Sequence, residues 1–324
     1  MAVAAVSTAA PLIRVADAPT LAIAFWRNAL ALPVLAVVVA WPWGGRSPAG
    51  GSSAAGSPAG VSSAEGSSAG GSSAAGGRVR ATTPLGQRER RLSTVAGLFL
   101  AAHFATWVPS LSFTSVASSV ALVATQPVWA AVIARGRGEH VPVGAWWGIG
   151  AGVAGVIMLS GVDVSVEPRA LFGDLLALAG GVFAAAYVTV GAQVRRTLPT
   201  SVYSLVCYGV AAGALLVVCL AGRQPLAGGR YDAVTWLALV GLMAGPQLLG
   251  HTVMNRVLGT TSPTLVSVAI LFEIVGAGLL AWAAFGEVPP ATAAPAGVLI
   301  ALGVVLVVRA GGGAQAVSGA PALE

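Results

Sequence analysis

Residues 265–290 form a largely apolar run with one carboxylate, Glu273, inside it and a second, Glu287, close to its end. A helix of roughly 20 apolar residues is long enough to cross the hydrocarbon core of a bilayer. A carboxylate at that depth costs at least ~2.5 kcal/mol to insert, so it faces protein or a water-filled cavity. The run therefore predicts a membrane helix beside a polar interior, with Glu273 as a candidate functional residue.

The composition of the whole chain agrees with a membrane protein. Hydrophobic residues make up 56% of the 324 residues and charged residues only 9%, whereas a soluble domain carries about 25% charged residues. The apolar runs do not alternate in polarity as barrel strands do, so we predict an all-α integral membrane protein. The net charge of +6 comes from arginines in the loops, a pattern that sets membrane orientation rather than one that binds nucleic acid.

Ten membrane spans are predicted from the hydropathy pattern. The first is short and contains Pro11, so it is either a stunted helix or the end of a helix that starts upstream of Met1. The predicted spans are 2–17, 21–42, 93–112, 116–134, 143–161, 171–194, 201–221, 234–254, 263–285 and 291–309.

The arginines favour one orientation of these spans. Most of them fall in loops that are cytoplasmic if the amino end is inside, and few fall in the outer loops. The positive-inside rule then predicts that both termini are cytoplasmic. If the first span does not insert, the amino end lies outside instead. The outer arginines are Arg14, Arg169, Arg223 and Arg230.

Two segments are predicted to lack a packed structure. Residues 44–92 begin with a tract of Gly, Ser and Ala that cannot bury enough apolar surface to order itself, so they are predicted to be a flexible cytoplasmic linker. This linker separates helices 1–2 (1–43) from helices 3–5 (93–161) of a first repeat, and 171–309 form a second repeat. Residues 310–324 are predicted to be a disordered tail.

The two halves of the chain share a spaced pattern of residues. Short motifs of the first half recur in the second half after 147 or 148 residues. Because this offset corresponds to five spans, an odd number, the second copy would lie upside down in the membrane. Inverted repeats are typical of secondary transporters, whose site lies at the repeat interface. The pairs are Thr114-Ser115 with Thr261-Ser262, Gln126-Pro127 with Glu273-Ile274, and Gly138-Glu139 with Gly286-Glu287.

These motifs resemble those of a known family. Gly250-His-Thr-Val-Met-Asn255, Ser262-Pro-Thr-Leu-Val-Ser267, Leu271-Phe-Glu273 and Gly286-Glu287 resemble the second repeat of the EamA family in the drug/metabolite transporter superfamily. In the first half, residues 18–27 resemble the second helix of that family, and Thr125-Gln-Pro127 with Gly138-Glu139 resembles its fourth.

The resemblance implies ten transmembrane helices in two inverted five-helix repeats, with a central cavity and alternating access. Members of the EamA family are mostly bacterial inner-membrane exporters of amino acids, other metabolites or drugs. Three features depart from the family pattern: a short first helix, a long connection before the third helix, and Ile274 in place of the proline that bends the ninth helix.

Three polar residues of the eighth span are candidates for the cavity wall. Gln247, His251 and Asn255 are spaced i, i+4 and i+8, which places them on one helical stripe. A polar stripe in a membrane helix faces the bundle interior, where it could bind substrate. The alternative is interhelical hydrogen bonding, worth roughly 0.6 kcal/mol per bond.

His103 and Trp107 form an i, i+4 pair on the third span. Histidine titrates near neutral pH and could relay protons, and Trp107 could stack against a flat or cationic substrate. The alternative for Trp107 is a position in the aromatic belt at the membrane interface.

Four further residues complete the candidate site. Glu273 could load and release a proton, or it could be a structural carboxyl bonded to backbone or His251. Gln126, its counterpart by repeat, could line the opposite wall. Arg27 could meet an anionic substrate group or snorkel to the headgroups, and Tyr187 could line the cavity or pack in the core.

Three functions are compatible with this pattern. The first is a secondary exporter, coupled to protons through Glu273, with a small-molecule substrate and membrane lipids as its partners. The second is a lipid or lipid-linked-sugar flippase, or an accessory subunit of one. The third is a membrane enzyme that uses His103, His251 and Glu273 as metal ligands or acid–base groups.

The exporter remains the leading prediction, with no catalytic residue, metal or cofactor and no nucleic-acid partner. The H-E-x-x-H, H-x-x-E-H and ATP-binding G-x-x-x-x-G-K-[ST] motifs are missing from the sequence. Nothing in the sequence specifies an oligomeric state.

The two cysteines are predicted to be packing residues. Cys207 and Cys219 lie twelve residues apart in one apolar run. On a helix this spacing separates them by about 18 Å, too far for a disulfide.

Overall fold

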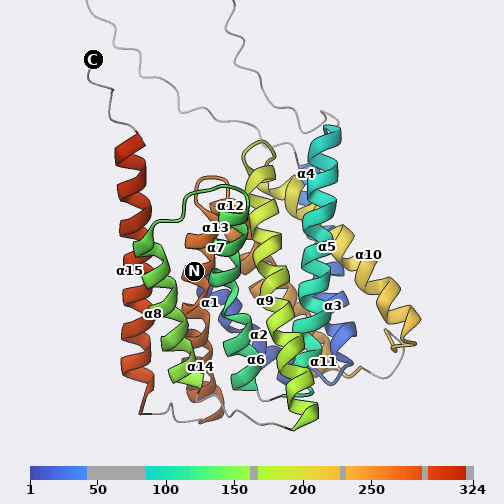
Figure 1. The fold of residues 1–324 in the computed structure, drawn as a ribbon. Helices are drawn as coiled ribbons and strands as arrows, with labels where there is room; N and C mark the ends of the chain where they lie inside the picture. Colours follow the sequence, from blue (N-terminus) through green and yellow to red (C-terminus); the bar gives the residue numbers. More distant parts are fainter. Residues whose placement is uncertain (42–84, 115, 161–166, 227–230, 287–290, 319–324) are drawn as a thin grey trace, which may run out of the picture.

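The computed structural model describes residues 1–41, 85–114, 116–160, 167–226, 231–286 and 291–318 (Figure 1). Within these ranges the regular structure is helical, and no strand occurs. Seven of the described helices are long and apolar enough to cross a membrane. The prediction of an all-helical membrane protein is therefore confirmed.

Each of the ten predicted spans falls on helix. Five spans are single helices: α5 (Gln87–Ser110), α8 (Val143–Ser160), α9 (Pro168–Arg195), α10 (Thr200–Ala221) and α15 (Ala293–Ser318). The other five are interrupted: α1 (Ala2–Ser7) with α2 (Ala9–Val15), α3 (Thr20–Ala29) with α4 (Ala31–Ala40), α6 (Val116–Val123) with α7 (Gln126–Gly136), α11 (Ala233–Leu242) with η1 (Met243–His251) and α12 (Thr252–Val257), and α13 (Pro263–Ile270) with α14 (Phe272–Phe285).

Seven of these ten segments are long and apolar enough to cross a membrane, and the apolar helices found in the other three are Ala2–Val15, Val143–Met158 and Pro263–Gly276 among the described residues. The topology of ten crossings thus remains a prediction.

Two predicted boundaries differ from the structure. Helix α5 begins at Gln87, inside the predicted linker, because the backbone N–H of Gly86 donates to Glu89 Oε2 at 3.1 Å and caps the first turn. Helix α15 continues to Ser318, so residues 310–318 are helical although we predicted a disordered tail from 310. Helix propensity alone misses this extension, since it disfavours three consecutive glycines. The remaining predicted linker, 44–84, and tail, 319–324, lie outside the described residues.

The fourth and ninth spans are interrupted at equivalent places. Helix α6 gives way to α7 just before Gln126, and α13 gives way to α14 just before Phe272. Bonds of the i→i+3 type tighten both junctions: Thr125 N donates to Leu122 O at 3.2 Å, and Ile274 N donates to Leu271 O at 3.3 Å. The ninth span is therefore broken even though Ile274 stands where the family has proline.

Both of these spans also end in a left-handed glycine. Gly138 has φ +81° and Gly286 has φ +70°, a backbone region that glycine adopts without strain and other residues avoid. The two glycines are the pair related by an offset of 148 residues in the sequence.

Replacing Gly138 by alanine is expected to lower the free energy of unfolding by ~1 kcal/mol, because alanine is strained at positive φ. The matched control is Gly136→Ala, since Gly136 is helical and a Cβ there meets nothing within 4 Å. That control should be neutral or slightly stabilising. Unfolding in mixed detergent micelles measures both, and equal stability of the two variants would contradict the role of φ.

The helices pack into two apolar clusters. The larger contains buried residues of α3, α5, α9 and α10, and the smaller contains those of α7, α8, α13 and α15. Helix α1 packs on η1 and α14, α9 packs on α5, α6 and α7, and α8 packs along α15.

The cysteines lie as predicted. Cys207 and Cys219 are both free, and both are buried in α10.

Candidate functional site

An internal cavity lies where the two halves of the chain meet. Its volume, counted as the space open to the centre of a water molecule, is about 70 Å³, well above the ~10–15 Å³ that one water needs. Its polar and aromatic lining is Arg27, His103, Trp107, Gln126, Tyr187, His251, Asn255, Ser267 and Glu273. Aliphatic residues such as Val6, Val120, Val188 and Ile270 form the rest.

Eight of the nine candidate residues predicted from the sequence line this cavity, and Gln247 does not. Residues Met243–His251 form a π-helix that contains Pro246, and its hydrogen bonds close over five residues rather than four. Gln247 itself is fully buried and bonded to Arg27 and Asn28, so it does not share the cavity wall with His251 and Asn255 as predicted.

Gln247 instead holds Arg27 in place. Arg27 Nε donates to Gln247 Oε1 at 3.0 Å, and Gln247 Nε2 donates to Asn28 Oδ1 at 3.0 Å. The guanidinium also lies 4.2 Å above the ring of Phe104, a cation–π contact. Arg27 is only 1% exposed, so it lies inside the bundle and the snorkelling alternative is wrong.

Aromatic rings make up one wall of the cavity. His103 stacks on Trp107 with ring centroids 5.5 Å apart, and His251 meets Phe104 edge-on at 5.6 Å. Tyr187 lies 6.3 Å from His251. Trp107 is 6% exposed and faces the cavity, so its alternative as a membrane-interface residue is wrong.

His103 has a defined polar contact. Its Nδ1 lies 2.9 Å from the carbonyl oxygen of Gly180. Because a carbonyl only accepts, Nδ1 carries a proton and donates it. Among the described residues, no group of three or more His, Cys, Asp or Glu side chains is placed to hold a metal.

Gln126 and Glu273 occupy equivalent positions on the two interrupted spans. Gln126 is the first residue of α7, and Glu273 lies in the first turn of α14. Amino ends of helices favour acceptor and anionic groups, so Glu273 suits its place. Gln126 Nε2 donates to Ser267 Oγ at 2.9 Å, which joins the fourth span to the ninth across the cavity.

Asn255 and Tyr187 are already engaged with one another. Tyr187 Oη donates to Asn255 Oδ1 at 2.6 Å, and Asn255 Nδ2 donates to Ser204 Oγ at 3.2 Å. With its amide satisfied at both ends, Asn255 fixes the position of the Tyr187 ring.

Two polar residues of the site were not predicted from the sequence. Ser267 lines the cavity, and the repeat offset does not mark it, because its counterpart 147 residues earlier is Val120. Asn28 supports Arg27 through Gln247, and no spacing rule marked it.

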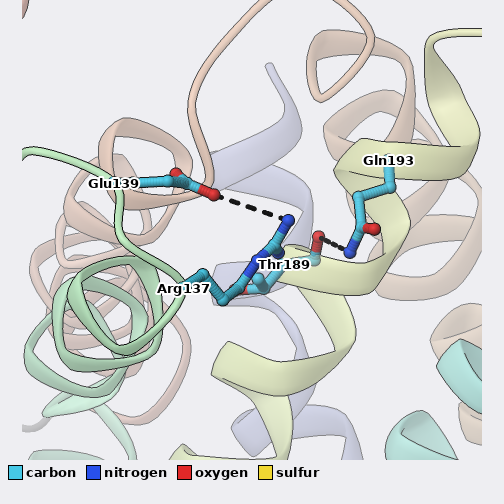
Figure 2. Close-up of polar contacts among 4 residues, drawn as sticks. All are labelled: Arg137, Glu139, Thr189 and Gln193. Atoms are coloured by element: carbon cyan, nitrogen blue, oxygen red, sulfur yellow. Dashed lines mark hydrogen bonds and ion pairs between the residues drawn. The ribbon is translucent and has the colours of Figure 1, made fainter.

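Replacing Gln247 by leucine is expected to lower the free energy of unfolding by about 2 kcal/mol, because the buried Nε of Arg27 and Oδ1 of Asn28 lose their hydrogen-bond partner. The matched control is Gln193→Leu. Gln193 makes only a 3.5 Å contact with the carbonyl of Thr189 (Figure 2), so its loss should cost less than ~0.5 kcal/mol. Unfolding of both variants in mixed micelles is the measurement, and equal losses would contradict a supporting role for Gln247.

Comparison with known proteins agrees with this architecture. None of the curated proteins matches the chain. A solved structure titled "Crystal structure of protein" is similar in fold, with a TM-score of 0.65, 19% sequence identity, and coverage of 94% of this chain and 93% of the other.

The family comparison identifies the second half of the chain. Residues 171–309 match the EamA-like transporter family, so the resemblance seen in the motifs of the second repeat is confirmed. Together with the helices long enough to cross a membrane, this match makes the chain a multi-pass membrane protein that carries an EamA-like transporter domain, of the drug/metabolite transporter superfamily, over residues 171–309.

Proposed function

We propose that the chain is a secondary transporter that exports small metabolites, amino acids or drugs across the bacterial inner membrane by alternating access. The observation that carries this proposal is the cavity between the two halves, where polar side chains of α3, α5 and α7 face those of η1, α13 and α14. Transporter sites lie at such interfaces between repeats. The small volume favours a compact solute over a lipid headgroup with its two acyl chains.

We propose further that the chain consists of two inverted five-helix repeats. The paired helix breaks before Gln126 and Phe272, and the paired left-handed glycines, support this arrangement. The packing pairs support it as well. In the proposed repeat, the span of α1 is the partner of α9, the span of η1 is the partner of α5, and the span of α14 is the partner of α6 and α7. Helix α1 packs on η1 and α14, and its partner α9 packs in the same way on α5 and on α6 and α7.

The proposed orientation has both termini in the cytoplasm. The start of α5 and the end of α15 lie at the same end of the bundle (Figure 1), and both carry arginines: Arg88, Arg90 and Arg91 on α5 and Arg309 on α15. The positive-inside rule places that end on the cytoplasmic side.

We assign proton coupling to Glu273. It is a carboxylate that lines the same cavity as Arg27. Loading a proton on this carboxylate changes the charge that the cavity presents to a substrate.

Metabolite profiling of medium and cytosol tests the proposal in cells that overproduce the protein. We expect one compound or a small group to be enriched outside the cells with the intact protein and not with the empty vector. The identified compound is then followed in proteoliposomes under an imposed pH gradient. Absence of any enriched compound, together with protein-dependent lipid translocation in liposomes, would replace export with flippase activity.

A further inference from the structure

Building on the proposed transport function, we propose that Arg27 and Trp107 form a subsite for a carboxylate-type anionic group, and that the cavity binds compact solutes that join such a group to an apolar or aromatic body. The juxtaposition of two buried donors with an aromatic wall carries this inference.

Both side chains carry a hydrogen-bond donor with no partner. Arg27 Nη1 and Trp107 Nε1 are buried, and neither makes a hydrogen bond with any of the described residues. Buried donors are nearly always satisfied in folded proteins. Both residues line the cavity, so an acceptor group that enters it can satisfy them together.

Helix α5 brings the two side chains together. Phe104 and Trp107 are three residues apart on α5 and so share a face of that helix. Arg27 lies against the Phe104 ring, while Gln247 occupies its Nε. The guanidinium is thus anchored at Nε and leaves Nη1 for a ligand, a geometry suited to the planar oxygens of a carboxylate.

The charges around this subsite favour an anion. The titratable groups that line the cavity are Arg27, His103, Tyr187, His251 and Glu273, and Tyr208 lies just behind them, bonded to Gln247 O at 3.3 Å. A guanidinium removed from water needs a negative partner. An entering carboxylate and Glu273 therefore compete for Arg27, and anion binding should be accompanied by proton uptake at Glu273.

The rest of the lining suits an apolar body. The rings of His103 and Trp107 are stacked at an interplanar angle of 14°, and aliphatic residues complete the walls. A flat ring attached to a carboxylate can place its oxygens at the donors and its face against these surfaces.

Three probes of one size and shape test the anion subsite: benzoate, benzamide and benzylammonium. Binding of each to the purified full-length chain in detergent micelles is measured by titration calorimetry. We expect benzoate to bind at least tenfold more tightly than benzamide, and benzylammonium not to bind. Benzoate binding should also be stronger at lower pH. Preferential binding of benzylammonium, equal binding of benzoate and benzamide, or no binding of benzoate would overturn the inference.

The Trp107→Phe variant isolates the second donor, because it keeps the aromatic ring and removes the N–H. We expect it to weaken benzoate binding about tenfold. The matched control is Trp147→Phe, since Trp147 on α8 is 73% exposed and should have no effect. Thermal unfolding of both variants monitors the fold. Unchanged benzoate binding by Trp107→Phe would remove Trp107 from the subsite.

This binding experiment is independent of the transport proposal. Benzoate binding by a protein that moves no solute in proteoliposomes would contradict transport and leave the subsite standing. Flux of a cationic solute without benzoate binding would contradict the subsite and leave transport standing.

Discussion

Replacing Glu273 by glutamine is expected to abolish pH-driven transport while the protein still folds. The amide has nearly the size and shape of the carboxyl group and keeps the cavity intact, but it can neither release a proton nor compete as an anion for Arg27. Proteoliposome flux under an imposed pH gradient should fall at least tenfold, to the level of liposomes without protein. Size-exclusion chromatography and thermal unfolding should show a folded variant.

The matched control is the same substitution at Glu139. This carboxylate lies in the loop after α7, has a side chain that is 54% exposed, and pairs with Arg137 at 3.5 Å (Figure 2). An exposed pair of this kind contributes between 0 and about 1 kcal/mol, so Glu139→Gln should transport normally. Normal pH-driven flux in the Glu273→Gln variant would remove the assignment of proton coupling to Glu273.

Replacing Gly303 by leucine is expected to destabilise the protein by at least ~3 kcal/mol, the upper range for overpacked sites. Helices α8 and α15 cross so closely here that a Cβ at Gly303 would lie 2.6 Å from the carbonyl oxygen of Gly148 and 2.8 Å from the nitrogen of Gly152. Both contacts are with backbone, which cannot rotate away as a side chain does. Small residues permit such close crossings in membrane bundles.

Gly297→Leu, on the same helix, is the control for this substitution. A Cβ at Gly297 meets nothing within 4 Å, and leucine is the better helix former by somewhat less than ~1 kcal/mol. This variant should be as stable as the parent protein or slightly more stable. If Gly303→Leu does not accumulate, Gly303→Ala should still unfold ~1–3 kcal/mol more easily than Gly297→Ala. Equal stabilities would mean that the two helices separate at little cost.

The helical spans could be predicted from sequence because membrane insertion depends on summed hydropathy, which is a local property. The interruption before Phe272 could not be predicted, because no proline marks it. It is formed by i→i+3 hydrogen bonds between residues that have no special turn preference. The early start of α5 depended on a single cap from Glu89, and such contacts shift helix ends by a few residues.

The candidate site was predicted largely by one argument, that polar groups in apolar spans face the interior. Arg27, Trp107 and Glu273 could be predicted in this way, but their positions relative to one another could not. Gln247 differs because its amide is used by Arg27 and Asn28 inside the bundle, and side-chain partners of this kind cannot be read from spacing. Ser267 was not predicted because a lone serine in an apolar helix can satisfy itself on its own backbone.

Because Cys207 and Cys219 are buried, the native chain should show little labelling by thiol reagents. Water-soluble maleimides react with exposed thiolates, and both native sulfurs are shielded by neighbouring helices. A cysteine introduced at Ser267 would then report by its labelling rate when the cavity opens to one side of the membrane. The unaltered sequence is therefore ready for accessibility mapping, without first removing its own cysteines.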